Sequence, residues 1–311
     1  MTISVIIVSW NAKTFLLQCI QSILLQRSAY PIEIIVVDNA SSDGSPEGVR
    51  NSFPTVKLIC NQDNYGFAKG NNIGIRASKG EYLFLINSDV NVRENCFNNM
   101  IEYMEDHHEI GMLGPRIVDS NNRTQRSCMG YPSLRNILSR ALALDSLFPK
   151  SKIFGGQLLT FWGHDQIRSV NVINGCFWML RKSALTQVGL LDERFFIYGE
   201  DIDWCKRFNQ CGWDVVFFPH AEATHYGGAS SANAPIRFYL EMQRANYQYW
   251  MKHHTRLASK VFLLINLLHH SVRIVCEIVM YPLVRTNRID STYKIKRCLA
   301  SINWSFMQLL Q

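Results

Sequence analysis

Short apolar runs alternate with helically periodic segments through the first 115 residues. Four apolar runs predict strands buried on both faces of a parallel sheet: 3–9, 32–38, 56–61 and 82–87. Four periodic segments predict helices: 12–26, 45–53, 66–78 and 95–107. Strands and helices in alternation predict a doubly wound, mainly parallel α/β sheet.

The pattern changes beyond residue 115. Residues 116–170 are polar and rich in loop-forming residues, and only 133–148 looks amphipathic. Order resumes with a strand and short helix over 170–185, a loop and helix over 195–212 and a strand over 213–219. The α/β pattern therefore returns after a loop-rich interval.

Polar residues follow each of the first four predicted strands. They are Ser9-Trp10-Asn11, Asp38-Asn39, Asn61-Gln62-Asp63-Asn64 and Asn87-Ser88-Asp89. Asn and Asp also favour turns, but the turns expected at the opposite edge show no such enrichment. In open parallel sheets ligands bind beyond the carboxyl ends of the strands. We therefore expect a ligand site at this edge, with Asp89 standing in it.

Residues 235–281 have the pattern of one long helix, and its most apolar part is 260–281. A polar stripe recurs along that part: Asn266, His269, His270, Arg273 and Glu277. Charges in the middle of a membrane span cost ~2.5–3.5 kcal/mol each. The pattern therefore favours a helix lying in the membrane interface. Packing against the rest of the protein, or against a second copy, is the alternative.

The charge of +7 is concentrated near the C-terminus. Residues 232–311 hold eleven Lys and Arg against three acids, which favours an anionic partner such as a membrane surface. Nucleic acid is not expected, because the apolar residues there form a helix face and not a stacking platform. Nine cysteines without a CxxC pair, and an N-terminus without a basic leader, favour a cytosolic protein with reduced thiols.

Seven motifs occur in an order that resembles the family 2 glycosyltransferases, and most closely their rhamnosyltransferase-like branch. They are VSWN (8–11), VVDNASSDGS (36–45), NQDNYGFAKGNNIGI (61–75), NSDV (87–90), NGCFWMLRKSAL (174–185), LDERFFIYGEDIDWCKR (191–207) and HYGGAS (225–230). The resemblance implies a GT-A fold, a nucleotide-sugar donor, inverting transfer and a divalent metal, Mg²⁺ or Mn²⁺.

The resemblance also implies a division of the chain. A glycosyltransferase domain is expected over 1–231, with a nucleotide-binding part over about 1–115 and an acceptor part over about 116–231. A basic, amphipathic helical tail is expected over 232–311.

Nucleotide binding is assigned by the resemblance to residues at the strand-end edge and just after it. They are Ser9, Asn11, Asp38, Asp63, Asn64, Gly66, Lys69, Asn71, Asn87 and Ser88. Glycines at every fourth position after residue 65 permit close approach to a ligand, but they equally suit helix packing.

NSDV stands where the family has a metal-binding DxD motif, with Asn87 in place of the first Asp. Asp89 is then the strong anionic ligand, and His225 matches a histidine that approaches the metal or the diphosphate.

GEDIDWC (199–205) matches the family's ED motif, which implies that Asp201 is the catalytic base and that Glu200 and Asp203 orient groups or bind the acceptor. Acids at a helix start also complement its dipole, but three in four positions exceed that need. Trp178 and Tyr198 would wall the acceptor sugar or belong to the core.

The resulting hypothesis is an inverting transfer of rhamnose from dTDP-rhamnose to a lipid-linked glycan in cell-surface polysaccharide synthesis. The enzyme would be cytoplasmic and peripheral on the inner face of the membrane. The alternative is a UDP-sugar-dependent transferase. A decayed, membrane-associated binding protein is less favoured, because Asp89 and Asp201 are present. A sugar-1-phosphate nucleotidyltransferase is also disfavoured, because SWNAKTF replaces its phosphate loop. A homodimer stays open.

Overall fold

The computed structural model describes residues 1–227, 235–280 and 288–311, which divide into two compact units. Unit 1 comprises residues 1–129 and 162–233, and unit 2 comprises residues 130–161 and 234–311. Residues 130–161 therefore group with the C-terminal helices, although they fall inside the 1–231 domain expected from the sequence. Residues 228–230 of the HYGGAS motif and Arg285 of the basic tail lie outside the described residues.

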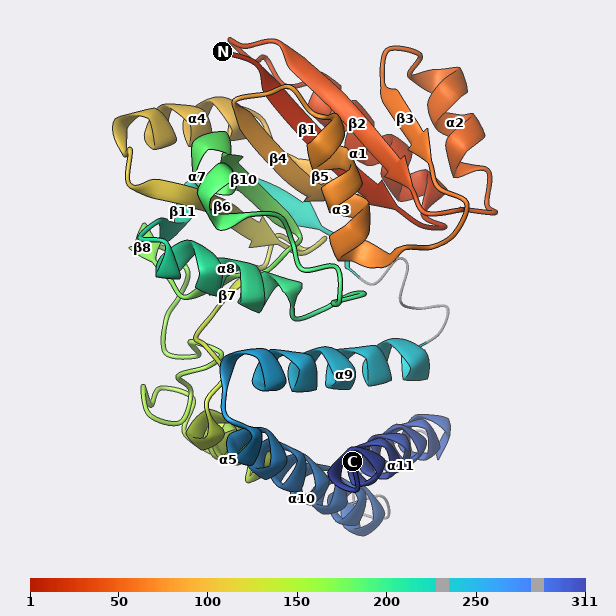
Figure 1. Ribbon diagram of the computed structural model, residues 1–311, viewed down its shortest axis with the longest axis vertical. Helices are drawn as coiled ribbons and strands as arrows, with labels where there is room; N and C mark the ends of the chain where they lie inside the picture. Colours follow the sequence, from red (N-terminus) through yellow and green to blue (C-terminus); the bar gives the residue numbers. More distant parts are fainter. Residues whose placement is uncertain (228–234, 281–287) are drawn as a thin grey trace. The chain divides into compact units, whose positions relative to one another are not determined.

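Unit 1 is an α/β unit built on one mixed sheet (Figure 1). Its strands are β1 (Ile3–Ser9), β2 (Ile32–Asp38), β3 (Lys57–Cys60), β4 (Tyr82–Asn87), β5 (Val90–Val92), β6 (Ile110–Val118), β7 (Cys128–Met129), β8 (Arg168–Ser169), β9 (Val172–Ile173), β10 (Phe177–Arg181) and β11 (Asp214–His225). Its helices are α1 (Lys13–Leu24), α2 (Ser45–Ser52), α3 (Gly66–Ala77), α4 (Cys96–Asp106), α7 (Lys182–Val188) and α8 (Glu200–Gln210).

The sheet follows the order β3-β2-β1-β4-β10-β6-β11-β5 among the described residues, with β8 paired to β11. The first four strands are parallel to one another, and β11 is parallel to β6. Strand β10 is antiparallel to both β4 and β6. The expected mainly parallel, doubly wound sheet is confirmed, and it is mixed because β10 lies antiparallel between β4 and β6 and because β5 and β8 pair antiparallel with β11.

Helices cover both faces of the sheet. On one face, apolar residues of α1 and α4 join alternate residues of β1 and β4 in the core cluster, which includes Leu16, Ile20, Phe97, Val5 and Phe84. On the other face α3 lies so close that a Cβ on Gly74 would collide with Ile6. The fourfold glycine spacing therefore serves helix-on-sheet packing at this position.

Strand β11 extends further than the sequence pattern predicts. Residues 213–219 read as a strand that stops at Pro219, but β11 continues to His225. The pairing of β11 with β6 shifts register between Phe218 and Glu222, so the strand continues beyond residues 219–221. This extension carries His225 to the edge where β4 ends, because His225 pairs with Val90 of β5.

Unit 2 is helical among its described residues: α5 (Leu134–Ala141), α6 (Leu144–Leu147), α9 (Pro235–His253), α10 (Arg256–Met280) and α11 (Arg288–Leu309). The expectation of one helix over 235–281 is wrong, because α9 ends at His253 and α10 begins at Arg256. Thr255 explains the break, since its side chain accepts a hydrogen bond from the amide of Ala258 at 3.2 Å and so starts a new helix.

Candidate functional site

The carboxyl ends of β1, β2 and β4 meet at one edge of the unit 1 sheet. Ser9 pairs with Asp38 across β1 and β2, and Val8 pairs with Asn87 across β1 and β4. The expected convergence of polar strand ends is therefore present. Asn87 itself is held through its backbone, because its amide donates to the carbonyl of Cys176 at 2.9 Å.

Two buried oxygens at this edge have no hydrogen-bond partner among the described residues: Ser9 Oγ and Asp38 Oδ1. Both side chains are only 1% exposed. The other oxygen of Asp38 accepts from the amide of Ser41 at 2.9 Å, which fixes the carboxylate in place. Buried polar atoms are normally paired, so these two indicate room for a hydrogen-bonding ligand.

Asn11 ties two loops of this edge together. Its amide donates to Ser41 Oγ at 2.9 Å, and its Oδ1 accepts from the amide of Ser42 at 2.8 Å. Its backbone has a left-handed φ of 48°. Asn11 therefore holds the loop after β1 against the loop after β2.

The segment that starts α3 contains five of the predicted nucleotide-binding residues. Asn64 Oδ1 accepts from the amide of Gly66 at 2.9 Å, and Asn71 Nδ2 donates to the carbonyl of Phe67 at 3.0 Å. Lys69 lies over the Tyr65 ring, with its Nζ 3.9 Å from the ring centroid. Asp63 is exposed. Asn64 and Asn71 thus act on the local backbone in this structure.

The start of α3 is joined to the loop that precedes α8. The amide of Phe67 donates to the carbonyl of Phe196 at 2.6 Å. Gly66 has a φ of +80°, and a Cβ there would collide with the same carbonyl. A glycine is therefore required at position 66 for both conformation and contact.

Asn72 completes this junction, and sequence reasoning missed it. Its Nδ2 donates to the carbonyl of Leu191 and to Glu193 Oε1, both at 2.9 Å, and its Oδ1 accepts from the amide of Leu191 at 3.1 Å. Asparagine is disfavoured in helix interiors, so the two adjacent asparagines in the middle of α3 could have indicated a contact to a distant segment.

Asp89 and His225, the two predicted metal ligands, lie together. His225 Nε2 is 3.3 Å from Asp89 Oδ1. The other ring nitrogen of His225 is 3.3 Å from Gln125 Oε1, and Gln125 Nε2 donates to the His225 carbonyl at 2.8 Å. Ser88 is buried beside Asp89. Gln125 therefore fixes the histidine ring against the carboxylate.

Metal binding at this pair would need ligands from outside the protein. Within residues 1–227, 235–280 and 288–311, no three His, Cys, Asp or Glu side chains gather as a metal site. One carboxylate and one imidazole fit Mn²⁺, which accepts nitrogen and oxygen ligands, better than Mg²⁺, which prefers oxygen.

Glu200 and Asp201 begin α8 after Gly199, whose left-handed φ of 78° turns the chain into the helix. Glu200 is 5% exposed, and its Oε2 has no hydrogen-bond partner among the described residues. Burial and the neighbouring Asp201 raise the pKa of Glu200 well above its usual value. Burial raises the pKa of Asp201 to about 6, against the lowering effect of backbone amides such as that of Ile202.

The carboxylates of Asp89 and Asp201 both lie near one buried thiol. The negative charges of Asp89 and Asp201 act with burial to raise the pKa of Cys176 to about 12. Cys176 follows Gly175, whose backbone also hydrogen-bonds to Asp201. The strand-end edge and the start of α8 therefore belong to one site, with a carboxylate that titrates near neutrality on its α8 side.

The predicted acceptor-binding residues have different surroundings. Trp178 is fully buried, its Nε1 donates to the carbonyl of Ile173 at 3.0 Å, and its ring packs against Trp204. Because Trp178 is a core residue, it cannot wall a sugar in this structure. Tyr198 is half-buried in the loop before α8, with a φ of 70°.

Asp203 is also a core residue. Its side chain is 0% exposed and lies 3.0 Å from Arg207 Nε, one turn further along α8. The guanidinium of Arg207 also donates to the carbonyls of Val188 and Leu190. Asp203 therefore positions an arginine that joins α8 to the end of α7.

Comparison with known proteins identifies relatives of the chain. Residues 4–189 match Glycosyl transferase family 2. The N-acetylglucosaminyl-diphospho-decaprenol L-rhamnosyltransferase of Mycobacterium tuberculosis is 26% identical over 241 residues, which cover 72% of this chain and 76% of the relative. The dTDP-rhamnosyl transferase RfbF of Shigella flexneri is 26% identical over 303 residues, which cover 94% and 89%.

Solved structures share the fold at low sequence identity. The mannosyltransferase PcManGT of Pyrobaculum calidifontis, solved with GDP-Man and Mn²⁺, has a TM-score of 0.58 at 15% identity, over 99% of this chain and 86% of its own. TarS of S. aureus has a TM-score of 0.53 at 15% identity, over 87% and 44%. The expected GT-A fold is confirmed. The match over residues 4–189 shows that the chain belongs to glycosyl transferase family 2 and is a glycosyltransferase.

Proposed function

We propose that this enzyme is an inverting rhamnosyltransferase that uses dTDP-rhamnose and a lipid-linked glycan acceptor in cell-surface polysaccharide synthesis. The names of the two relatives that act as rhamnosyltransferases support the sugar, and one of those names also supports a lipid-linked acceptor. The observation that carries the mechanism is the carboxylate of Asp201, with a pKa of about 6, in one site with Asp89.

Asp201 acts as the general base. Its deprotonated carboxylate takes the proton of an acceptor hydroxyl while that oxygen attacks the anomeric carbon of the donor. The bond from the anomeric carbon to the donor phosphate breaks on the opposite face, so the configuration inverts. A pKa near 6 keeps the base mostly deprotonated at pH 7 while leaving it basic enough to accept the proton.

The nucleotide lies along the strand-end edge. Ser9 Oγ and Asp38 Oδ1 supply hydrogen bonds to the base or ribose, because they are the fixed, unpaired oxygens there. Asn11, Asn64 and Gly66 shape the loops around the nucleotide by the contacts already described. Two charged side chains lie nearby: Lys69 suits the diphosphate, and the exposed Asp63 suits the ribose hydroxyls. Asn87 and Ser88 complete the edge.

Asp89 and His225 would hold a divalent metal, best fitted by Mn²⁺. When bound, such an ion would supply positive charge close to the leaving diphosphate. The raised pKa of Glu200, caused by burial and the neighbouring Asp201, favours its neutral form beside the base. Tyr198, half-buried in the loop before α8, is the remaining aromatic candidate to contact the acceptor sugar.

The protein acts in the cytoplasm at the inner surface of the membrane, where a lipid-linked acceptor is accessible. By length and composition, one described helix, Arg256–Val279, is apolar enough to cross a membrane. Its exposed apolar face and the basic tail support peripheral attachment.

A donor panel tests this function. Purified full-length enzyme is incubated with a membrane extract and, in turn, dTDP-rhamnose, UDP-glucose, UDP-galactose or GDP-mannose, and release of the nucleoside diphosphate is followed. The proposal predicts extract-dependent release of dTDP above the other diphosphates. Faster turnover of a UDP-sugar would show that the donor is a UDP-sugar and not dTDP-rhamnose. No release from any donor would contradict the proposed glycosyl transfer.

A further inference from the structure

Helix α10 of unit 2 presents an apolar stripe outward and a polar stripe inward. Its exposed apolar residues include Leu257, Leu264, Leu268, Val275 and Val279. These spacings of seven and four residues put them on a single stripe of the helix. The polar stripe of Asn266, His269, His270, Arg273 and Glu277 lies on the opposite side of the same helix and lines a cavity.

Helix α11 shares the cavity but has a mixed outer stripe. Lys294 and Arg297 line the cavity, and on the other side Leu299 and Phe306 are exposed together with Lys296 and Asn303. A helix on the surface of an ordinary globular protein buries its apolar stripe and exposes its polar one. The reversal in α10 indicates that its outer surface meets something apolar and that its inner surface meets something polar.

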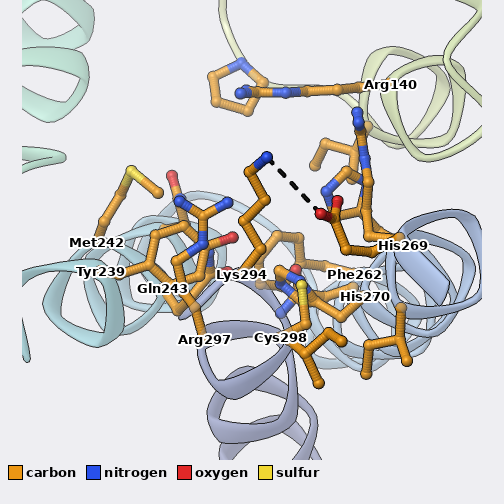
Figure 2. Close-up of a pocket in the computed structure, with 18 of the residues that line it drawn as sticks. Arg140, Tyr239, Met242, Gln243, Phe262, His269, His270, Lys294, Arg297 and Cys298 are labelled. Atoms are coloured by element: carbon orange, nitrogen blue, oxygen red, sulfur yellow. Dashed lines mark ion pairs between the residues drawn. The ribbon is translucent and has the colours of Figure 1, made fainter. Parts of the chain in front are cut away.

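The cavity lies entirely within unit 2, between α5, α9, α10 and α11, and its volume is about 520 Å³ (Figure 2). Small-molecule sites typically measure ~300–1,000 Å³. Among the described lining residues, four cations face one carboxylate: Arg140, Arg273, Lys294 and Arg297 against Glu277. Lys294 is 3.8 Å from Glu277, so the three arginines give the cavity its net positive charge.

Two buried donors in the cavity have no acceptor. Both ring nitrogens of His270 and Nε of Arg297 have no hydrogen-bond partner among the described residues, and His270 is 1% exposed. Burial and the adjacent cations lower the pKa of His270 to about 3 and that of His269 to about 4, so both rings are neutral at pH 7. A neutral imidazole still carries one N–H donor. Unpaired buried donors among cations fit a ligand made of acceptor oxygens.

We propose that this cavity binds the phosphate or diphosphate headgroup of a lipid, whose hydrocarbon chain lies against the exposed apolar stripe of α10. The positive charge of the cavity would recognise the phosphate, and the outward apolar stripe of α10 is the reason to expect that the phosphate carries a hydrocarbon chain. Binding does not require sugar transfer, so its failure would leave the proposed function intact.

Binding of farnesyl diphosphate, inorganic pyrophosphate and farnesol to the full-length protein, measured by titration calorimetry with dTDP present to fill the nucleotide site, tests the proposal. Farnesyl diphosphate is expected to bind at least about 10-fold more tightly than either fragment. The double variant Arg273→Gln and Arg297→Gln should weaken it by about 100-fold or more, because two charge-assisted hydrogen bonds to the phosphate are lost together.

The matched control is Lys260→Gln with Lys296→Gln, which removes two exposed positive charges from the same two helices outside the cavity lining. It should change the affinity by less than about 2-fold, since distant exposed charges are screened. Arg140→Gln, an exposed position on α5 with little packing to lose, should weaken binding even if the double variant unfolds.

Four outcomes would overturn the proposal. Equal loss in the cavity and control variants would mean nonspecific charge attraction. Pyrophosphate binding as tightly as farnesyl diphosphate would mean a free-anion site without a lipid. Competition by dTDP would place the ligand in the nucleotide site, and the absence of binding by all three probes would leave the cavity without the proposed ligand.

Discussion

The pair Glu200 and Asp201 begins one helix, yet the two carboxylates are suited to different tasks. Glu200 is almost fully buried with one unpaired oxygen, and burial together with Asp201 raises its pKa well above the usual value. Asp201 receives backbone hydrogen bonds that limit the effect of burial, so its pKa rises only to about 6. The different surroundings favour the neutral form of Glu200 and suit Asp201, with its pKa of about 6, to act as a base near pH 7.

The rate of transfer should depend on pH through Asp201. The base works only when deprotonated, so kcat should fall about tenfold per pH unit below a pKa of about 6 and level off above it. A plot of log kcat against pH between 4.5 and 8, at saturating donor, measures this dependence. A flat profile down to pH 5 would exclude a base with that pKa.

Replacing Glu200 with glutamine should stabilise the fold, and more so at high pH. The folded-state pKa of Glu200 lies above its unfolded value, so wild-type stability is lost as pH rises from about 4.5 through the folded pKa. Glutamine does not ionise. The gain in unfolding free energy should therefore be larger at pH 8 than at pH 5. Urea unfolding at both values tests it, and an equal gain at both would contradict it.

At the scale of elements, the first four strands and the helices between them were predictable from the sequence. The spacing of their apolar residues changes between the strand period and the helix period at Gly, Pro and Asn. Strand β6 was missed, since Gly111, Gly114 and Pro115 weaken its local strand signal. The break between α9 and α10 was missed because its signal is a single residue, Thr255, whose side chain caps the start of α10.

For the site, the strand-end residues and the carboxylates at the start of α8 were predictable as types placed at element ends. Burial was not predictable. Asp203 stands in the same motif as Asp201, but α8 turns its side chain into the core, and β10 does the same for Trp178. Asn72 was missed because its partners, Leu191 and Glu193, lie far away in sequence.

The ion pair between Asp203 and Arg207 is expected to stabilise α8 and not to bind the acceptor. Asp203→Asn should lower the unfolding free energy by ~3 kcal/mol, because Arg207 loses its buried charged partner. Activity per folded molecule and the acceptor KM should stay near wild type. Thermal unfolding and steady-state kinetics separate these effects. An unchanged melting temperature with a raised acceptor KM would restore the acceptor-binding role.

Helix α10 tests the outward apolar stripe. Leu264 is 55% exposed and Leu268 is 43% exposed, so charges there should not disturb the packing of unit 2. Phe262, two residues before Leu264, is buried against Trp250 and is left unchanged.

Leu264→Glu with Leu268→Glu should reduce flotation with anionic vesicles by about 10-fold or more, because each leucine that enters the bilayer contributes ~1.5–3 kcal/mol to binding. Leu264→Ala with Leu268→Ala, which adds no charge, should give a smaller loss. Circular dichroism checks folding. A folded glutamate variant that floats as well as wild type would make the stripe a protein-packing surface.

At the scale of the whole molecule, the chain combines two units with different surfaces. Unit 1 carries the nucleotide edge and the base, and belongs to glycosyl transferase family 2 through most of its length. Unit 2 carries the outward apolar stripe of α10 and a cationic cavity.

The base assignment is the centre of this account, and Asp201→Asn tests it most directly. The amide keeps the shape of the side chain and removes the base. We expect dTDP release from dTDP-rhamnose in the presence of the lipid-linked acceptor to fall ~10²–10⁴-fold, the usual contribution of a general base. The donor Kd, measured separately by calorimetry, should stay within about threefold of wild type. Wild-type turnover by the variant at matched donor occupancy would contradict the account.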